Sequence, residues 1–153
     1  MELQLFIIWN TGYKFHQNII QSLSSVFQIK AVYMTEWNKA TTLNKMIKLY
    51  DFSSTEAKTK ISECGYGKTI IVIVEDLHPS KKLHITKYGN IEVSKHALEI
   101  KEKIRNDYQN KNIIHGTMLD FEFNNDIKIC LNKTREDFIN ELSEGEKGDI
   151  CII

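Results

Sequence analysis

Hydrophobic and polar residues follow two kinds of pattern along this chain, and together they predict alternating strands and helices. Short apolar runs predict strands at residues 4–9, 29–34, 69–74 and 112–114. The run at 69–74 is β-branched almost throughout, which predicts a central strand buried on both faces. Between these runs, apolar residues recur at helical spacing and predict helices at about residues 15–27, 38–50, 54–63, 94–108, 120–131 and 134–142.

Local signals mark the ends of several elements. Ser54 and Asp120 are each predicted to cap a helix. Residues 83–93 predict a hairpin around Tyr88-Gly89-Asn90, because Gly-Asn suits a two-residue turn. The order of elements predicts an α/β (α+β) protein, namely a ferredoxin-like two-layer sandwich with a four-stranded antiparallel sheet. We assign residues 1–143 to a single domain and residues 144–153 to a C-terminal tail.

Composition and charge narrow the classes of protein to which the chain can belong. Lysine plus arginine number 20 and aspartate plus glutamate number 20, so the net charge is zero. This balance gives no general attraction to nucleic acids or anionic membranes, and no segment approaches the ~20 apolar residues needed to span a bilayer. The three cysteines form no CxxC pair and indicate reduced thiols, so we expect a cytoplasmic protein.

The sequence also contains patterns that are typical of ligand sites. Gly65-Tyr66-Gly67-Lys68-Thr69 ends like a P-loop, but the earlier glycine is missing and a strand follows, so we interpret it as a turn. The irregular spacing of His78, His84 and His96 does not match zinc ligands, and no metal site is predicted. Several lysines form either a basic surface near Arg105 or an ordinary solvated face: Lys81, Lys82, Lys87, Lys95, Lys101 and Lys103.

One block of the sequence carries a recognisable motif. It contains Ile104-Arg105-Asn106-Asp107-Tyr108, followed by Asn112-Ile113-Ile114-His115-Gly116-Thr117. These runs resemble the active-site block of nucleoside diphosphate kinases, which reads I-R-G-D-F, then N-[IV]-[IV]-H-G-S-D, then a helix carrying a glutamate. Three residues are missing here between the two runs. The resemblance covers about residues 103–131, and elsewhere only the order of elements agrees, over roughly residues 3–131.

The resemblance implies phosphoryl transfer through His115. In the family the histidine attacks the γ-phosphate of a nucleoside triphosphate, becomes phosphorylated and passes the group on. Imidazole suits this role because it is a good nucleophile at neutral pH. By the same resemblance, Arg105 would hold the phosphates and Asn112 would contact the sugar. Asp126 lies eleven residues after the histidine, where the family has the glutamate that orients the imidazole.

The resemblance adds three residues to the candidate phosphate site. Thr117 stands where the family has a serine, Gly116 belongs to the same motif, and Tyr50 would correspond to a helix tyrosine near the phosphates. Taken alone, Tyr50 either packs at its helix end or contacts the ligand, and Asp126 is either a solvated residue or the histidine's partner. The family also implies Mg²⁺ bound with the nucleotide rather than by the protein, and a homo-oligomer, with which the apolar residues 150–153 are compatible.

The sequence departs from the family at three places. Trp9-Asn10-Thr11 stands where the family has a lysine in a K-P-D run, and a Lys-rich segment at 94–103 replaces the nucleotide loop. A second arginine has no counterpart, which leaves Lys82 or Lys87 as candidates. We therefore interpret the chain as a divergent phosphotransferase with an unidentified acceptor. The alternatives are a catalytically silent nucleotide- or partner-binding module, and a phosphate-ester or nucleotidyl transferase in which His115 acts as an acid or base without being phosphorylated.

Overall fold

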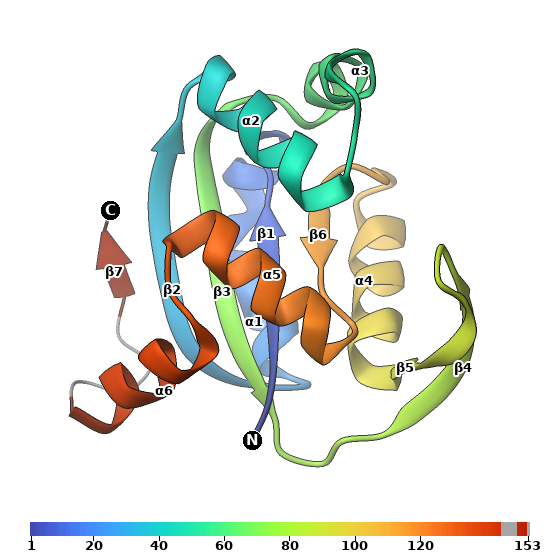
Figure 1. The fold of residues 1–153 in the computed structure, drawn as a ribbon, viewed down its shortest axis with the longest axis vertical. Helices are drawn as coiled ribbons and strands as arrows, with labels where there is room; N and C mark the ends of the chain where they lie inside the picture. Colours follow the sequence, from blue (N-terminus) through green and yellow to red (C-terminus); the bar gives the residue numbers. More distant parts are fainter. Residues whose placement is uncertain (145–149, 153) are drawn as a thin grey trace.

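A single sheet forms the centre of the computed structural model, which describes residues 1–144 and 150–152 (Figure 1). Its strands are β1 (Glu2–Ile8), β2 (Gln28–Trp37), β3 (Gly67–Asp76), β6 (Ile114–Gly116) and β7 (Ile150–Ile152). Four of them form the predicted antiparallel sheet, in the order β6-β1-β3-β2, and β7 pairs in parallel with β2. The sequence analysis placed β7 in the tail. The domain boundary at residue 143 stays a prediction, and residues 145–149 and 153 lie outside the described part.

Helices pack against both faces of the sheet (Figure 1). α1 (His16–Ser24) and α4 (Lys95–Asp107) cover one face and complete the predicted ferredoxin-like unit. The core of the other face is built with α2 (Lys39–Tyr50), α3 (Ser54–Cys64), α5 (Asp120–Leu131) and α6 (Arg135–Glu144). Because successive strand residues point to opposite faces, β1 gives Leu5 and Ile7 to one core and Phe6 and Ile8 to the other. None of the described helices is both long and apolar enough to cross a membrane.

A separate hairpin, β4 (Lys81–Thr86) and β5 (Gly89–Ser94), projects beside α4 and confirms the hairpin predicted at residues 83–93 (Figure 1). Its two-residue turn is Lys87-Tyr88 and not the predicted Gly89-Asn90, which belong to β5; Gly89 has a φ of 101°, a conformation that favours glycine. The N–H of Ser94 donates to the carbonyl of Met118 at 3.0 Å, which ties the base of the hairpin to the chain after β6. One further element that the pattern did not predict is the 3₁₀ helix η1 (Asn10–Phe15).

Two predicted helix caps differ in the structure. The N-cap of α3 is Ser53 rather than Ser54: its hydroxyl accepts the N–H of Glu56, and the Glu56 carboxylate accepts the N–H of Ser53. This reciprocal pair is a capping box, which the spacing Ser53-x-x-Glu56 encodes. Asp120 lies inside α5, whose N-cap is Leu119 without a side-chain bond. An acidic residue in the first turn is still favourable there, because it faces the positive end of the helix dipole.

Replacing Ser53 with alanine is expected to lower the free energy of unfolding by about 1 kcal/mol, because the N–H of Glu56 loses its partner. Ser54→Ala is the matched control and should change the free energy by less than about 0.5 kcal/mol, as exposed substitutions usually do. Urea denaturation followed by circular dichroism measures both values. Equal losses in the two variants would contradict the assignment of Ser53 as the cap.

Candidate functional site

A pocket of about 960 Å³ lies where most of the predicted site residues meet. Its walls come from the end of α2, the β4–β5 hairpin, α4, β6 and α5. Five of the predicted residues line it: Tyr50, Arg105, His115, Gly116 and Asp126. The hairpin contributes His84 through Tyr88. The pocket is therefore built from segments far apart in the sequence.

His115 and Asp126 form a hydrogen-bonded pair in this pocket. Nε2 of His115 lies 2.7 Å from Oδ2 of Asp126, and their side chains are 13% and 3% exposed. The amide of Asn125 donates to the other carboxylate oxygen at 3.2 Å. Because an ionised carboxylate only accepts hydrogen bonds, this contact holds a proton on Nε2 and leaves the lone pair of the neutral imidazole on Nδ1. The structure thus places Asp126 as the partner of the histidine and not as a solvated helix residue.

Tyr50 fixes the histidine ring from the side. The two rings meet edge to face, with centroids 5.0 Å apart at 90°, and Phe52 stacks on the tyrosine at 4.9 Å. The Tyr50 hydroxyl is hydrogen-bonded to the indole of Trp9, and burial raises the pKa of the phenol above its ordinary value, so it stays protonated. Tyr50 therefore packs in the pocket wall, and its ring restricts the rotation of His115.

Two cations from α4 reach the strand that carries His115. Nη2 of Arg105 donates to the carbonyl of Ile114 at 3.1 Å, and Nζ of Lys101 donates to the carbonyl of Gly116 at 2.9 Å. Burial, and secondarily the charge of Arg105, lowers the pKa of the Lys101 ammonium to about 8. The two side chains therefore bind the backbone on either side of His115.

The sequence analysis placed Lys101 either in a basic surface near Arg105 or on a solvated face, and it missed the burial of this side chain because α4 was predicted to be a charged surface helix. Ala97, Ile100 and Ile104 of α4 are instead buried against the sheet, and Lys101 lies on the same face with only 7% of its surface exposed. A lysine inside an apolar helical stripe is unusual, since lysine is almost never fully buried without a partner. The position of Lys101 within the apolar stripe of α4 is therefore the sequence signal that identifies it as a buried lysine.

Gly116 allows α4 to approach β6 closely. A Cβ atom at this position would lie 2.6 Å from two ring carbons of Phe6 and 2.9 Å from Cδ of Lys101. These separations are far below van der Waals contact, and the obstructing groups are a buried ring and a buried lysine stem. Glycine is therefore required here for space rather than for an unusual backbone conformation.

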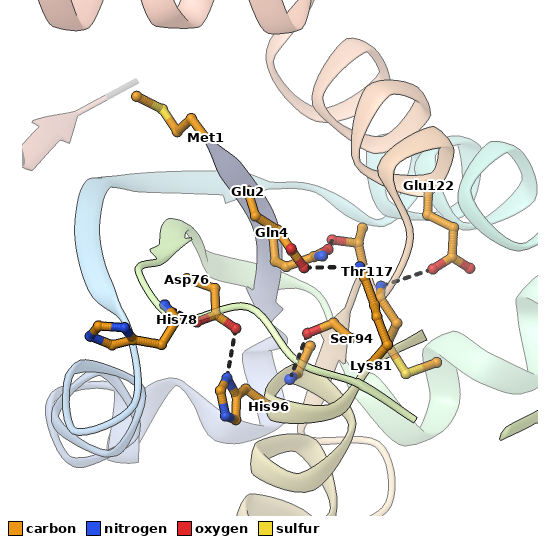
Figure 2. A network of polar contacts seen from close by, with 12 residues as sticks. Met1, Glu2, Gln4, Asp76, His78, Lys81, Ser94, His96, Thr117 and Glu122 are labelled. Atoms are coloured by element: carbon orange, nitrogen blue, oxygen red, sulfur yellow. Dashed lines mark hydrogen bonds and ion pairs between the residues drawn. The ribbon is translucent and has the colours of Figure 1, made fainter. Parts of the chain in front are cut away.

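Thr117 and Asn112 do not line the pocket. Thr117 is 1% exposed; its hydroxyl accepts the N–H of Leu5 at 2.9 Å and donates to Oε1 of Gln4 at 2.6 Å (Figure 2). Asn112 accepts from Lys60 at 3.2 Å and donates to Glu63 at 2.5 Å, which ties the start of β6 to α3. Both side chains are thus engaged in joining elements of the scaffold.

Other candidate groups lie apart from the pocket. Asp76 accepts from Nδ1 of His96 at 2.7 Å and from the N–H of His78, which joins the end of β3 to the start of α4 (Figure 2). Gly65 and Tyr66 form the predicted turn between α3 and β3, and residues 67–69 already belong to that strand. Burial raises the pKa of the Cys64 thiol to about 11, so it is not a nucleophile at neutral pH. Within residues 1–144 and 150–152, no group of three or more metal-ligating side chains is arranged to hold a metal ion.

Comparisons with known proteins identify the architecture. No protein-family model and no curated protein matches the chain. Among solved structures, it is similar to the apo nucleoside diphosphate kinase of Encephalitozoon cuniculi, with a TM-score of 0.55 and 16% sequence identity over 87% of this chain and 90% of that one. The nucleoside diphosphate kinase of Aquifex aeolicus gives a TM-score of 0.52 and 13% identity, over 89% of this chain and 97% of that one.

A third solved structure, the nucleoside diphosphate kinase of Borrelia burgdorferi, is a transition state mimic with bound vanadate and ADP. Its TM-score is 0.52 at 13% identity, and the match covers 89% of each chain. The matches thus extend over most of each chain, at identities that establish architecture alone. The chain therefore has the fold of the nucleoside diphosphate kinases.

Proposed function

We propose that the chain is a phosphotransferase, in which His115 takes a phosphoryl group from a nucleoside triphosphate and passes it to an acceptor. The observation that carries this proposal is the hydrogen bond between Nε2 of His115 and the buried carboxylate of Asp126. A nucleophilic imidazole needs one nitrogen protonated and held, so that the other presents its lone pair. A buried carboxylate at 2.7 Å meets this requirement.

In the proposed reaction, Nδ1 of His115 attacks the γ-phosphorus. The bond between that phosphorus and the bridging oxygen breaks, and its electron pair leaves with the nucleoside diphosphate. Asp126 stabilises the positive charge that the phosphorylated imidazole carries, because its carboxylate lies beside the protonated Nε2. In the second half, an oxygen of the acceptor attacks the phosphorus, the P–N bond breaks, and its electron pair returns to Nδ1.

The charges around the pocket support an anionic substrate. The lining contains Lys48, Lys87, Lys101 and Arg105, against the acidic residues Asp51, Glu122 and Asp126. Two of these acids are already engaged, since Asp126 binds His115 and Glu122 accepts the N–H of Met118 at 2.9 Å. The four cations outnumber the three carboxylates, so the lining has a small excess of positive charge, and the engaged acids are held by partners within the protein. Mg²⁺ would enter on the phosphate oxygens of the nucleotide and neutralise part of their charge.

The other predicted residues take supporting roles in this proposal. Arg105 holds a phosphate, Tyr50 restrains the imidazole, and Gly116 lets α4 lie close to β6. Thr117 and Asn112 keep β6 in position through the partners described above. Assembly into a homo-oligomer, like a cytoplasmic location, is implied by the sequence and stays a prediction.

One observation favours the alternative, a catalytically silent binding module. Asn112, which the resemblance assigned to the sugar, has its amide occupied by Lys60 and Glu63. The Lys-rich segment at 94–103, most of which forms α4, also stands where the resemblance places a nucleotide loop. A module of this kind would bind a nucleotide or another phosphorylated small molecule in the same pocket without forming a phosphohistidine.

Labelling with γ-³²P-ATP and Mg²⁺ separates the two functions. The wild type is expected to take up an acid-labile, base-stable label, and His115→Ala should take up none. His84→Ala is the matched control, because His84 lines the same pocket and should not affect labelling. A folded wild type without label would contradict the phosphotransferase. Nucleotide binding that survives His115→Ala, again without label, would then support the module.

A further inference from the structure

The open edge of β6 is closed by two cations rather than by another strand. β6 is at the end of the sheet, and backbone bonds from Trp9 N–H to Ile113 O and from Thr117 N–H to Leu5 O join it to β1. Because the direction of backbone groups alternates along a strand, the carbonyls of Ile114 and Gly116 point to the open side. These are the carbonyls that Arg105 and Lys101 bind.

The spacing of the two cations matches the spacing of the two carbonyls. Lys101 and Arg105 lie one turn apart on α4, which places residues i and i+4 on one face at roughly 6 Å. Carbonyls two residues apart on a strand are separated by a similar distance, roughly 7 Å. His115 lies between them on β6 and contributes to the same pocket. The helix therefore delivers two positive charges, one on each side of the histidine.

Most of the hydrogen-bonding capacity of these cations is unused. An ammonium group has three N–H donors and a guanidinium has five, and the backbone takes one from each. Nε of Arg105 is buried without a partner. Among the described residues, neither cation forms an ion pair with a carboxylate, although both are partly or wholly buried. The charge of Arg105 lowers the pKa of Lys101, so the two neighbouring cations repel each other, and an anion bound between them would relieve this repulsion.

We propose that Lys101 and Arg105 together bind the phosphate chain of a nucleoside di- or triphosphate, and that Lys101 is the second phosphate-binding cation of this site. The choice of a nucleotide as the ligand rests on the proposed phosphotransferase function, whereas the arrangement of the two cations does not depend on that function. It assigns the role to a residue of α4, in place of Lys82 and Lys87, which the sequence analysis considered. Lys82 does not line the pocket, and Lys87 is exposed on the hairpin loop.

The proposal predicts a pH dependence of anion binding. Lys101 has a pKa of about 8, and the charged groups around it are Arg105 and Glu102 on α4 and Glu122 and Asp126 on α5. The imidazole of His115 lies on β6, next to the carbonyl of Gly116 that Lys101 binds. The ammonium is positive below this pH, so the affinity for tripolyphosphate is expected to be highest near pH 7. It should fall by up to tenfold per pH unit above pH 8, where the amine becomes neutral.

Isothermal titration calorimetry with tripolyphosphate between pH 7 and 9.5 tests this dependence. Lys101→Gln should weaken binding about 10- to 100-fold at pH 7, because it removes a charge-assisted hydrogen bond. Lys101→Arg should bind with little pH dependence across the range, since arginine does not lose its proton. Lys103→Gln is the control: it changes an exposed lysine on the same helix and should reproduce the wild-type profile. The ionisation of tripolyphosphate also changes with pH, but this change is the same for every variant and cancels when variants are compared at one pH.

A purely structural role for Lys101 gives a different result. If the lysine only closes the sheet edge, Lys101→Gln will be less stable but will bind tripolyphosphate as the wild type does. Identical pH profiles for the wild type and Lys101→Arg would overturn the proposal. If the variants do not fold, acetic anhydride labelling of the wild type decides: tripolyphosphate should protect Lys101 and leave Lys103 reactive. Equal labelling of Lys101 with and without the anion would overturn it.

Failure of this proposal is distinguishable from failure of the proposed function. The same titrations in the His115→Ala background need no phosphohistidine, so Lys101-dependent binding there supports the cation pair even if ATP never labels the protein. Conversely, a labelled wild type with a pH profile unaffected by Lys101→Arg keeps the phosphotransferase and excludes Lys101 from phosphate binding.

Discussion

Asp126→Asn is expected to slow phosphorylation of His115 by about 10²- to 10⁴-fold and to leave the protein folded. Asparagine keeps the size of the side chain in a site where the aspartate is 3% exposed. Its amide, however, carries no charge to stabilise the phosphorylated imidazole. It can also donate to Nε2, which would shift the ring proton to Nδ1 and remove the attacking lone pair. Rapid-quench labelling with γ-³²P-ATP measures the rate.

Two further variants make this result specific. Asp120→Asn changes an exposed carboxylate in the first turn of the same helix and should leave the labelling rate unchanged. Asp126→Glu restores the charge with one extra methylene, which a tightly packed site accommodates poorly, so an intermediate rate is expected. If Asp126→Asn is labelled as fast as the wild type, the carboxylate is not needed for the transfer, and the proposed role of the pair is wrong.

Thr117→Val is expected to lower the free energy of unfolding by roughly 2–5 kcal/mol. Valine has nearly the shape of threonine, but it leaves the N–H of Leu5 and Oε1 of Gln4 without partners, and both residues are fully buried. Each unsatisfied buried group costs about 1–3 kcal/mol. Nε2 of Gln4 already lacks a partner, so the buried amide cannot compensate within the native packing. Urea denaturation measures the change.

Thr117→Ser separates a structural role from a role in substrate binding. It keeps the hydroxyl and loses one methyl group, so about 1 kcal/mol or less of destabilisation is expected. Folded Thr117→Val should bind tripolyphosphate as tightly as the wild type, because the hydroxyl does not line the pocket. Unchanged stability together with weakened binding would instead assign Thr117 to the phosphate site, as the family resemblance implies.

The sequence was most informative where local chemistry decides the structure. The β-branched run at 69–74 lies in β3, the buried central strand. The side chains of β3 and of its neighbour β1 point alternately to the two faces of the sheet, so both strands contribute to both cores. The hairpin and the helices that follow the strands were predicted for the same reason. The pairing of β7 with β2 could not be predicted, because it joins Ile150 to Val32 across more than a hundred residues and no local pattern encodes that contact.

The candidate site likewise contains residues that the local motif predicted and residues whose contacts only the fold reveals. The motif spacing led to His115 and Asp126, which the structure places 2.7 Å apart. Thr117 belongs to the same motif, but its partner Gln4 lies 113 positions earlier, so its engagement away from the pocket was not visible. The burial of Lys101 was missed for the opposite reason. A lysine is normally assigned to solvent, and the apolar stripe of α4 outweighs that tendency only when the helix is seen against the sheet.

The β4–β5 hairpin has a consequence for the dynamics of the pocket. It is a two-stranded ribbon outside the main sheet, with Leu83 and Ile85 62% and 81% exposed, and such ribbons are marginally stable alone. Local opening of the ribbon should therefore need less free energy than global unfolding. Its backbone amides are expected to exchange with deuterium while those of β1 and β3 remain protected. Substrate could then enter and leave through fluctuations of one wall, while His115 and Asp126 stay fixed on the rigid sheet and helix.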